Sequence, residues 1–267
     1  MVGWLVAQAI VFVYHYVYWA TEPKYSHVRL VLESSLPIAR GSAAVINLCC
    51  SVMLFTVCRN IISLLRTSWI KKFVPLDDHI EFHKAVGVSI AFWTAVHIIA
   101  HTFNFLHLYT NTRGIITETP EDLALFSWPG ITGQVATVIF FLVFTSSLSK
   151  VRRKYYEIFW FAHHLIVIWF GILCVHGASG FITDNNGKAP GASFWKWWLP
   201  SAIVYTIERI FRQIKSQGMS TVISKVVQHP SKGTCRHEVV LHREMRKVLE
   251  GIHGVEIFEG TDSGPSY

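Results

Sequence analysis

Histidines recur at matched spacings in two apolar stretches of the chain. His83 and His97 lie 14 residues apart, and His163 and His176 lie 13 residues apart. On a helix, these separations correspond to roughly 21 Å and 20 Å along the axis. Neutral imidazole is a good axial ligand for haem iron, and one histidine from each of two facing helices can hold a haem. The spacing therefore predicts two haems stacked across a membrane, one between His83 and His163 and one between His97 and His176.

Rotation about the helix axis leaves one of these assignments open. Thirteen residues on a straight helix rotate His176 about 140° away from the face of His163, and the 12 residues from His164 rotate it about 120° the other way. Periodicity alone therefore does not choose between His163 and His164. A π-bulge, kink or curvature near Gly171 could absorb the error.

Further ionisable residues lie near these stretches. His101 comes 18 residues after His83 and returns to nearly the same face, so on spacing alone it competes with His97 as the outer ligand. Haem propionates need cationic partners in a low-dielectric site. The candidates flank one apolar stretch: Arg40, Arg59 and Arg66. For the last two, snorkelling to the cytoplasmic surface is an equal alternative. Arg40 is more informative, because it lies at the outer end.

The elements that position these side chains follow from the composition. Of 267 residues, 51% are hydrophobic and only 15% are charged, whereas soluble domains carry about 25% charged residues. A membrane-spanning helix needs about 20 mostly apolar residues. We therefore predict an all-α membrane protein, a bundle of six transmembrane helices at residues 2–20, 41–58, 85–108, 129–149, 158–178 and 194–211. The sixth is the weakest, since Lys196 and Glu208 lie near its ends.

The net charge is +7, and the distribution of the basic residues indicates which side of the membrane each loop occupies. In a soluble protein such an excess would suggest nucleic acid, but here most basic residues fall on one side of the predicted bundle. The positive-inside rule then predicts that the N- and C-termini are cytoplasmic. The basic excess therefore needs no nucleic-acid partner. We expect the membrane to be the plasma membrane or an endomembrane. The five cysteines form no CxxC pair and are interpreted as small apolar residues.

The composition changes after residue 217. We assign residues 1–217 to the six-helix domain, 218–232 to the start of a flavin-domain-like strand, and 233–267 to a divergent or truncated cytoplasmic tail. Residues 221–227 have strand character and precede His229-Pro230. The tail contains no glycine-rich phosphate loop.

Several motifs occur in an order that resembles the NADPH oxidase and ferric reductase superfamily. The match covers about residues 1–232 and is closest to superoxide-generating NADPH oxidases, a fungal-type member being one candidate. The motifs that carry it are Val57-Cys58-Arg59-Asn60, Phe82-His83-Lys84, the segment from Ala95 to His101, Gly130-Ile131-Thr132-Gly133, the segment from Arg152 to Trp160, His163-His164-Leu165, His176-Gly177 and Val226-Val227-Gln228-His229-Pro230.

The resemblance implies roles for individual residues. It selects His163 over His164 as the partner of His83 at the inner haem and assigns His97 and His176 to the outer haem. It also implies that Arg40 and His101 border the oxygen-reduction site. Arg59 and Arg66 match basic positions near the haem propionates.

The resemblance further implies transmembrane electron transfer through two b-type haems, reducing molecular oxygen to superoxide on the outer side. FAD and NADPH are expected for the full-length family, but we find no motif for either in this chain. We therefore expect an NADPH oxidase-type oxidoreductase that is inactive alone and needs a full-length version or a reductase partner as its electron donor. The implied partners are a lipid membrane, cytosolic regulators and a small membrane subunit. The alternatives are a ferric or metal reductase domain, a non-catalytic haem-binding subunit of an oxidase, and a proton channel without haem.

Overall fold

The computed structural model describes residues 2–69, 76–113, 115, 117–178, 182–217, 222–228 and 235–240. Their helices are α1 (Val2–Thr21), η1 (Pro23–Tyr25), α2 (Ser26–Leu32), α3 (Ser35–Met53), η2 (Phe55–Val57), α4 (Arg59–Arg66), η4 (Leu76–Asp78), α5 (His79–Asn111), α6 (Pro120–Phe126), α7 (Trp128–Ser147), α8 (Ser149–Lys154), α9 (Tyr156–His164), α10 (Ile166–His176) and α11 (Phe194–Gln217); the strands are β1 (Val222–Gln228) and β2 (Cys235–Val240).

The chain divides into two compact units, residues 1–206 and 207–267. The first holds the helices from α1 to α10 and the N-terminal half of α11. The second holds the rest of α11 and the antiparallel pair β1–β2. Strand β1 overlaps the segment predicted to be a strand, while its relation to a flavin domain stays a prediction. Residues 241–267 of the predicted tail lie outside the described residues.

The all-α membrane fold is confirmed for the first unit. Five of the described helices are long and apolar enough to cross a membrane: Val2–Thr21, Ser35–Val57, His79–Asn111, Trp128–Ser147 and Tyr156–His176. The predicted sixth span does form a helix, α11, but α11 is not among these five. Its polar C-terminal half explains this, because it carries Glu208, Arg209, Arg212 and Lys215. The count of six spans therefore stays a prediction.

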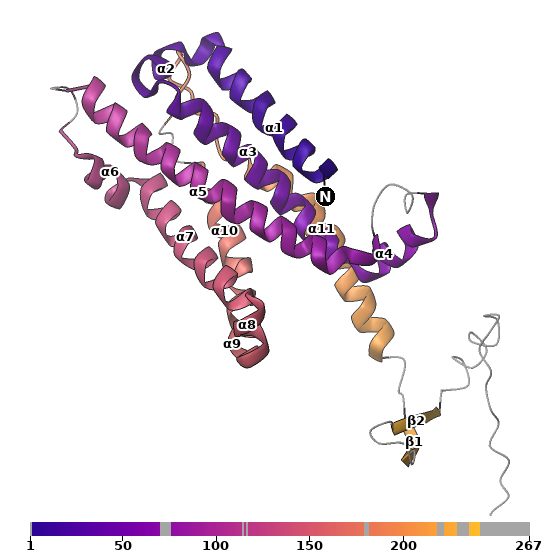
Figure 1. Cartoon of the computed structure of the whole chain (residues 1–267). Helices are drawn as coiled ribbons and strands as arrows, with labels where there is room; N and C mark the ends of the chain where they lie inside the picture. The colour runs from indigo at the N-terminus through magenta and orange to yellow at the C-terminus, as the bar shows by residue number, and fades with distance from the viewer. Residues whose placement is uncertain are drawn as a thin grey trace, which may run out of the picture. The chain divides into compact units, whose positions relative to one another are not determined.

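Helix α3 is the buried centre of the bundle. It lies between α1 and α5 and packs on both (Figure 1). Leu36, Val45, Cys49 and Cys50 on α3 are fully buried, as expected for cysteines that act as small apolar residues. At Gly41 a Cβ atom would lie 3.0 Å from the Phe12 ring, so glycine lets α1 approach closely.

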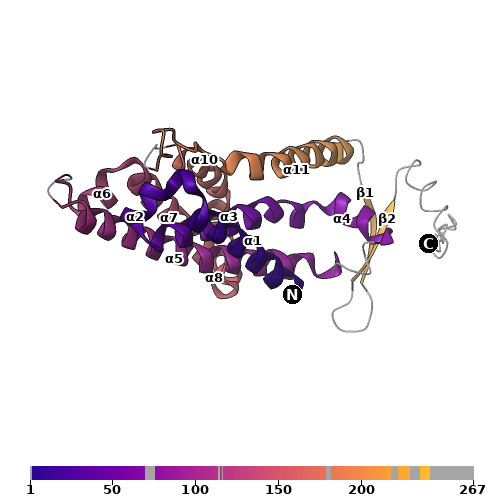
Figure 2. The same cartoon turned by 90° about the horizontal axis from the view of Figure 1, so that it is seen from above.

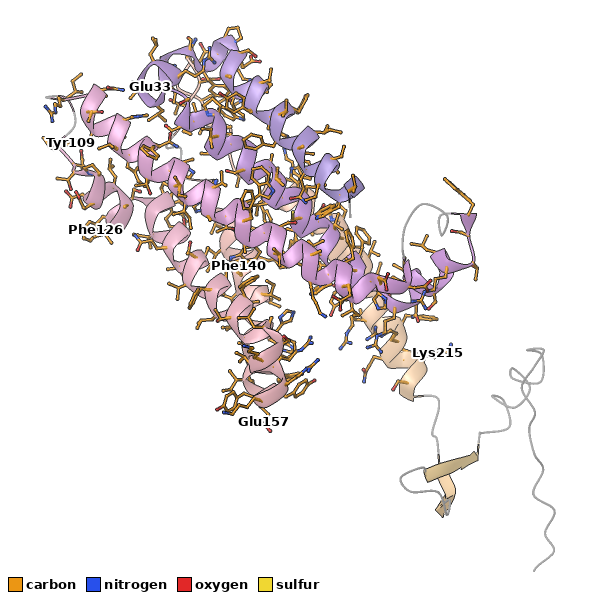
Figure 3. All side chains as sticks on the ribbon, in the orientation of Figure 1. Glu33, Tyr109, Phe126, Phe140, Glu157 and Lys215 are labelled. Atoms are coloured by element: carbon orange, nitrogen blue, oxygen red, sulfur yellow. The ribbon has the colours of Figure 1, made fainter. Side chains whose placement is uncertain are left out.

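Helix α7 is the central helix of a second packed group, which also contains α9 and α10. It packs on α9 and α10, and the Phe140 ring on α7 lies 5.3 Å from Trp169 on α10. Exposed apolar side chains project from these helices, as expected for lipid-facing surfaces (Figure 3). Helices α2 and α6 lie at one end of the bundle and α4 lies at the other (Figure 2). The two loop regions that contain α2 and α6, both predicted to lie on the outer side, therefore lie at the same end of the bundle.

The fifth span is broken at Leu165. The Leu165 N–H donates to the Ala162 carbonyl at 3.1 Å, a bond of the 3₁₀ type, and α10 then runs unbroken through Gly171. The irregularity expected near Gly171 therefore lies six residues earlier. A 3₁₀ turn has about 3.0 residues per turn, so it rotates the following residues further than an α turn does.

Gly130, near the start of α7, has no room for a side chain. A Cβ atom there would lie 2.4 Å from the Ala124 carbonyl oxygen and 2.6 Å from that of Leu123. We expect Gly130→Ala to lower the free energy of unfolding by about 1–3 kcal/mol, the usual cost of overpacking. Unfolding in detergent measures this. Gly87→Ala is the control, since a Cβ atom there meets nothing within 4 Å. An equal fall in the free energy of unfolding in both variants would contradict the close packing at Gly130.

Candidate metal centre

The structure brings the four predicted ligand histidines together as two pairs. His83 on α5 faces His163 on α9, with ring centroids 6.2 Å apart and an interplanar angle of 53°. His97 on α5 faces His176 on α10, with centroids 6.4 Å apart and an angle of 63°. One long helix thus contributes one histidine to each pair, and the broken fifth span contributes the other.

The separation within each pair suits one metal ion between two imidazoles. Imidazole nitrogen binds a first-row metal ion at about 2.0–2.1 Å. A five-membered ring with sides near 1.33 Å has its centre about 1.1 Å behind that nitrogen. Two rings on opposite sides of one ion therefore have centroids about 6.2–6.4 Å apart, which matches both pairs.

The protonation of the α5 histidines follows from their hydrogen bonds. His97 Nδ1 lies 2.9 Å from the Ala39 carbonyl oxygen, which can only accept, so Nδ1 carries the proton. His83 Nδ1 lies 2.7 Å from Thr56 Oγ1, and that hydroxyl already donates to the Met53 carbonyl at 2.6 Å. The hydroxyl therefore accepts from His83. Both rings keep the lone pair on Nε2, which is the form that binds metal.

The histidines of the fifth span follow the same pattern. His176 Nδ1 lies 2.8 Å from Thr132 Oγ1, and His163 Nδ1 lies 3.4 Å from Ser147 Oγ. Each hydroxyl donates to a carbonyl one turn earlier in α7, in both cases at 2.6 Å. Each is therefore an acceptor for the histidine. All four rings are oriented by a partner on a neighbouring helix and hold the same tautomer.

The ligand number favours haem over a bare ion. Within the part of the chain that the structure describes, no group of three or more His, Cys, Asp or Glu side chains could hold a metal ion. A zinc site needs about four ligands from protein or water. Two opposed imidazoles suit an iron whose other ligands come from a porphyrin. The residues present therefore fit haem.

His164 points away from this arrangement. Its Nδ1 lies 2.6 Å from the Trp160 carbonyl oxygen, and its ring lies 4.3 Å from the Trp160 ring. The structure thus pairs His163 with His83, the choice that periodicity left open.

A cavity of about 500 Å³ lies beside the His97–His176 pair and is lined by these two residues, His101 and Arg40. We call it the outer cavity, after the side of the membrane predicted for this pair. The His101 ring is 4.5 Å from that of His97 and nearly perpendicular to it. The Asn104 amide nitrogen, a donor, lies 3.4 Å from His101 Nδ1, which makes that atom an acceptor and puts the ring proton on Nε2. His101 therefore has the tautomer opposite to that of the four paired histidines and can donate a hydrogen bond.

Arg40 and the two inner arginines have different surroundings. The Arg40 guanidinium lies 4.5 Å from the centre of the Trp19 ring and lines the outer cavity. Arg59 is exposed at the start of α4, and Arg66 Nε lies 3.0 Å from Asp77 Oδ1. A role for Arg59 and Arg66 at haem propionates stays a prediction.

The sequence did not indicate which residues support the histidines, although Thr132 and Gly133 lie in a motif named above. Thr56, Thr132 and Ser147 orient the rings, and at Gly133 a Cβ atom would lie 3.2 Å from His176 Cε1. Hydroxyls in apolar helices at the depth of each histidine are a signal that could have found the first three.

Removing one supporting hydroxyl should weaken cofactor binding. We expect Thr132→Val to lower haem affinity about 10–100-fold, since His176 loses its orienting partner. Haem transfer to apomyoglobin measures the dissociation rate. Thr145→Val is the matched control, because the Thr145 hydroxyl bonds carbonyls of its own helix. Similar rates for both variants would exclude an orienting role for Thr132.

The fold and the site define a helical membrane protein with paired histidines between its spans. The chain belongs to the family described as ferric reductase like transmembrane component, whose pattern matches residues 40–174.

Similar proteins carry the names of oxidases. The chain is 30% identical to NADPH oxidase 1 of Mus musculus over 307 residues, covering 92% of this chain and 51% of that protein. It is 33% identical to a superoxide-generating NADPH oxidase heavy chain of Dictyostelium discoideum over 231 residues, covering 83% and 42%. NADPH oxidase 3 of Homo sapiens is 30% identical, with 86% and 51% covered. The chain thus spans about half the length of the curated relatives it matches and is a membrane protein of an oxidoreductase family.

Proposed function

We propose that the chain holds two b-type haems, one between His83 and His163 and one between His97 and His176, and carries electrons across the membrane to molecular oxygen. The observation that carries this proposal is the geometry of the two pairs. Both have the centroid separation of a bis-imidazole site, and all four Nδ1 atoms are held by acceptors. Two such sites on one long helix favour a relay over a single structural cofactor.

When bound, haem supplies one-electron redox chemistry at its iron. His83 with His163, and His97 with His176, would each hold one iron, so oxygen would accept its electron without binding the metal. Transfer of one electron to oxygen forms superoxide, with no bond broken and no proton required. Arg40 would then stabilise the anion formed in the outer cavity, and His101 could donate a hydrogen bond to it.

The proposed direction of transfer is outward, with both termini cytoplasmic. A reduced flavin on the cytoplasmic side is the proposed electron source, because NADPH oxidases are among the relatives. The proposal includes residues 218–232 as the beginning of a flavin-binding region.

A purified sample tests the proposal. We expect a reduced-minus-oxidised spectrum with b-type haem bands and a content of two haems per chain. Absence of these bands would exclude the proposal. With a reduced flavin as donor, superoxide should form and ferrous iron should not accumulate from ferric chelates. Ferrous iron instead would indicate a metal reductase. Haem without turnover, together with co-purification with an intact oxidase, would indicate a non-catalytic subunit.

A further inference from the structure

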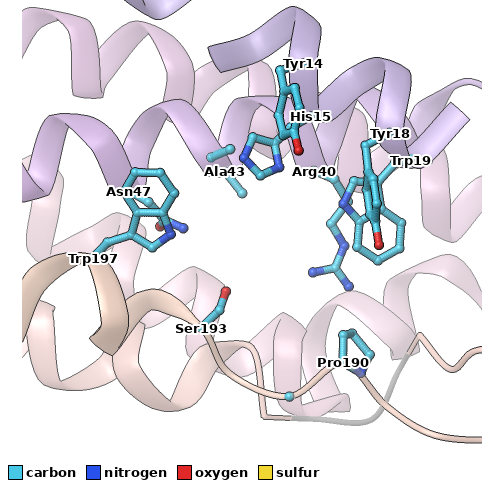
Figure 4. A pocket seen from close by; sticks show the side chains of 12 residues that line it. Tyr14, His15, Tyr18, Trp19, Arg40, Ala43, Asn47, Pro190, Ser193 and Trp197 are labelled. Atoms are coloured by element: carbon cyan, nitrogen blue, oxygen red, sulfur yellow. The ribbon is translucent and has the colours of Figure 1, made fainter. Parts of the chain in front are cut away.

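A second, smaller cavity adjoins the outer one on the side of α1. Its volume is about 270 Å³, room for several water molecules. Arg40, Asn47 and Ser193 line both cavities, so the two spaces meet at these side chains. His15 and Ala44 line only the smaller one. Figure 4 shows the Arg40 guanidinium, the His15 ring and the Ser193 hydroxyl around this space, from α3, α1 and the segment before α11.

The protein side chains around the smaller cavity give it a positive charge. Arg40 is a permanent cation, and none of the described residues that line either cavity is a carboxylate. The face of the Trp19 ring lies against the guanidinium, but it carries no full negative charge. The other polar groups around the cavity include hydroxyl, amide and imidazole groups, which can donate hydrogen bonds. Such a lining selects small anions.

We propose that the smaller cavity is an anion vestibule, through which the anionic product of the outer site leaves the protein. This inference rests on the proposed function, because superoxide is the anion formed next to Arg40. The guanidinium at the junction draws the anion from the outer cavity, and the donors beyond it receive the anion. Oxygen itself is neutral and needs no such lining, so the lining distinguishes the anionic product from the substrate.

Thiol labelling tests the charge of the vestibule without any haem chemistry. A His15→Cys variant is treated with a sulfonated (anionic) and a trimethylammonium (cationic) methanethiosulfonate of similar size. Thr110→Cys, at the exposed C-terminal end of α5, is the matched control and gives the ratio of the two rates for a cysteine outside the cavity. We expect the anionic-to-cationic rate ratio at His15→Cys to be about tenfold higher than this reference, because a positive cavity concentrates anions. Adding Arg40→Gln should return the ratio to that of the control. The unsubstituted chain reports any reaction of the native cysteines.

The same labelled protein tests the route. The sulfonate attached at His15→Cys should slow superoxide release several-fold, the trimethylammonium group should slow it less, and dithiothreitol should restore it, while the haem spectrum stays unchanged. The same ratio of labelling rates at His15→Cys as at Thr110→Cys, or unchanged release after complete labelling, would overturn the vestibule. A lack of haem bands or of superoxide in the unlabelled chain would instead overturn the proposed function, and the labelling rates would still judge the anion site.

Discussion

Replacing His163 with leucine is expected to remove about half of the haem bound per chain, because each site needs both of its axial histidines. Replacing the adjacent His164 with leucine should leave haem content unchanged. The two residues differ in what they face: His163 lies opposite His83, and His164 bonds the carbonyl of Trp160. Haem per chain, from the pyridine haemochrome and the protein concentration, measures both variants.

The His163→Leu variant also separates the two sites. Its remaining haem should be the one between His97 and His176, so electron delivery from a cytoplasmic donor to oxygen should be lost although haem is present. Full haem in His163→Leu combined with loss in His164→Leu would show that the fifth span is rotated relative to the structure. Full haem in both variants would exclude this span as the source of the inner ligand.

Replacing Gly133 with valine should empty the outer site. Even a Cβ atom at this position would lie 3.2 Å from His176 Cε1, and the branched side chain needs more space than the ring leaves. The ring must then turn away from His97. Because a displaced ligand lowers metal affinity at least as much as loss of its orienting partner, we expect a fall of about 100-fold or more at this site. Haem content and superoxide release measure the effect.

Gly171→Val is the matched control for this substitution. It places the same side chain on the fifth span, where a Cβ atom meets nothing within 4 Å. This variant should retain both haems and nearly full turnover. If both variants lost haem equally, the loss would reflect general destabilisation of the bundle. Retention of both haems in Gly133→Val would mean that His176 binds from another position.

The sequence predicted the parts of the fold that depend on composition along the chain. Five of the six predicted spans correspond to helices able to cross a membrane, since a long apolar run is visible without any knowledge of its neighbours. The sixth, at residues 194–211, is helical but lies within the longer α11, whose charged C-terminal part reduces its apolar character. Local patterning therefore identifies a helix more readily than it decides whether the helix crosses the membrane.

The sequence predicted the residue types of the site and its two histidine pairs, but spacing did not choose between His163 and His164. The 14-residue spacing of His83 and His97 works because α5 is continuous, and a continuous helix has a known rotation. The fifth span breaks this rule at Leu165, where a single 3₁₀ bond changes the rotation. The supporting hydroxyls lie on α7 and η2, away from the helices that carry the histidines, so their pairing with the histidines depends on packing.

The sequence by itself thus predicted a helical membrane protein with histidines spaced as the proposed haem sites require, because hydropathy and residue chemistry are properties of each segment. Spacing alone did not choose between His163 and His164, and the tertiary structure places His163 opposite His83. The structure also decided which ring nitrogen carries the proton and where Arg40 joins two cavities, because these features depend on atoms brought together from distant segments.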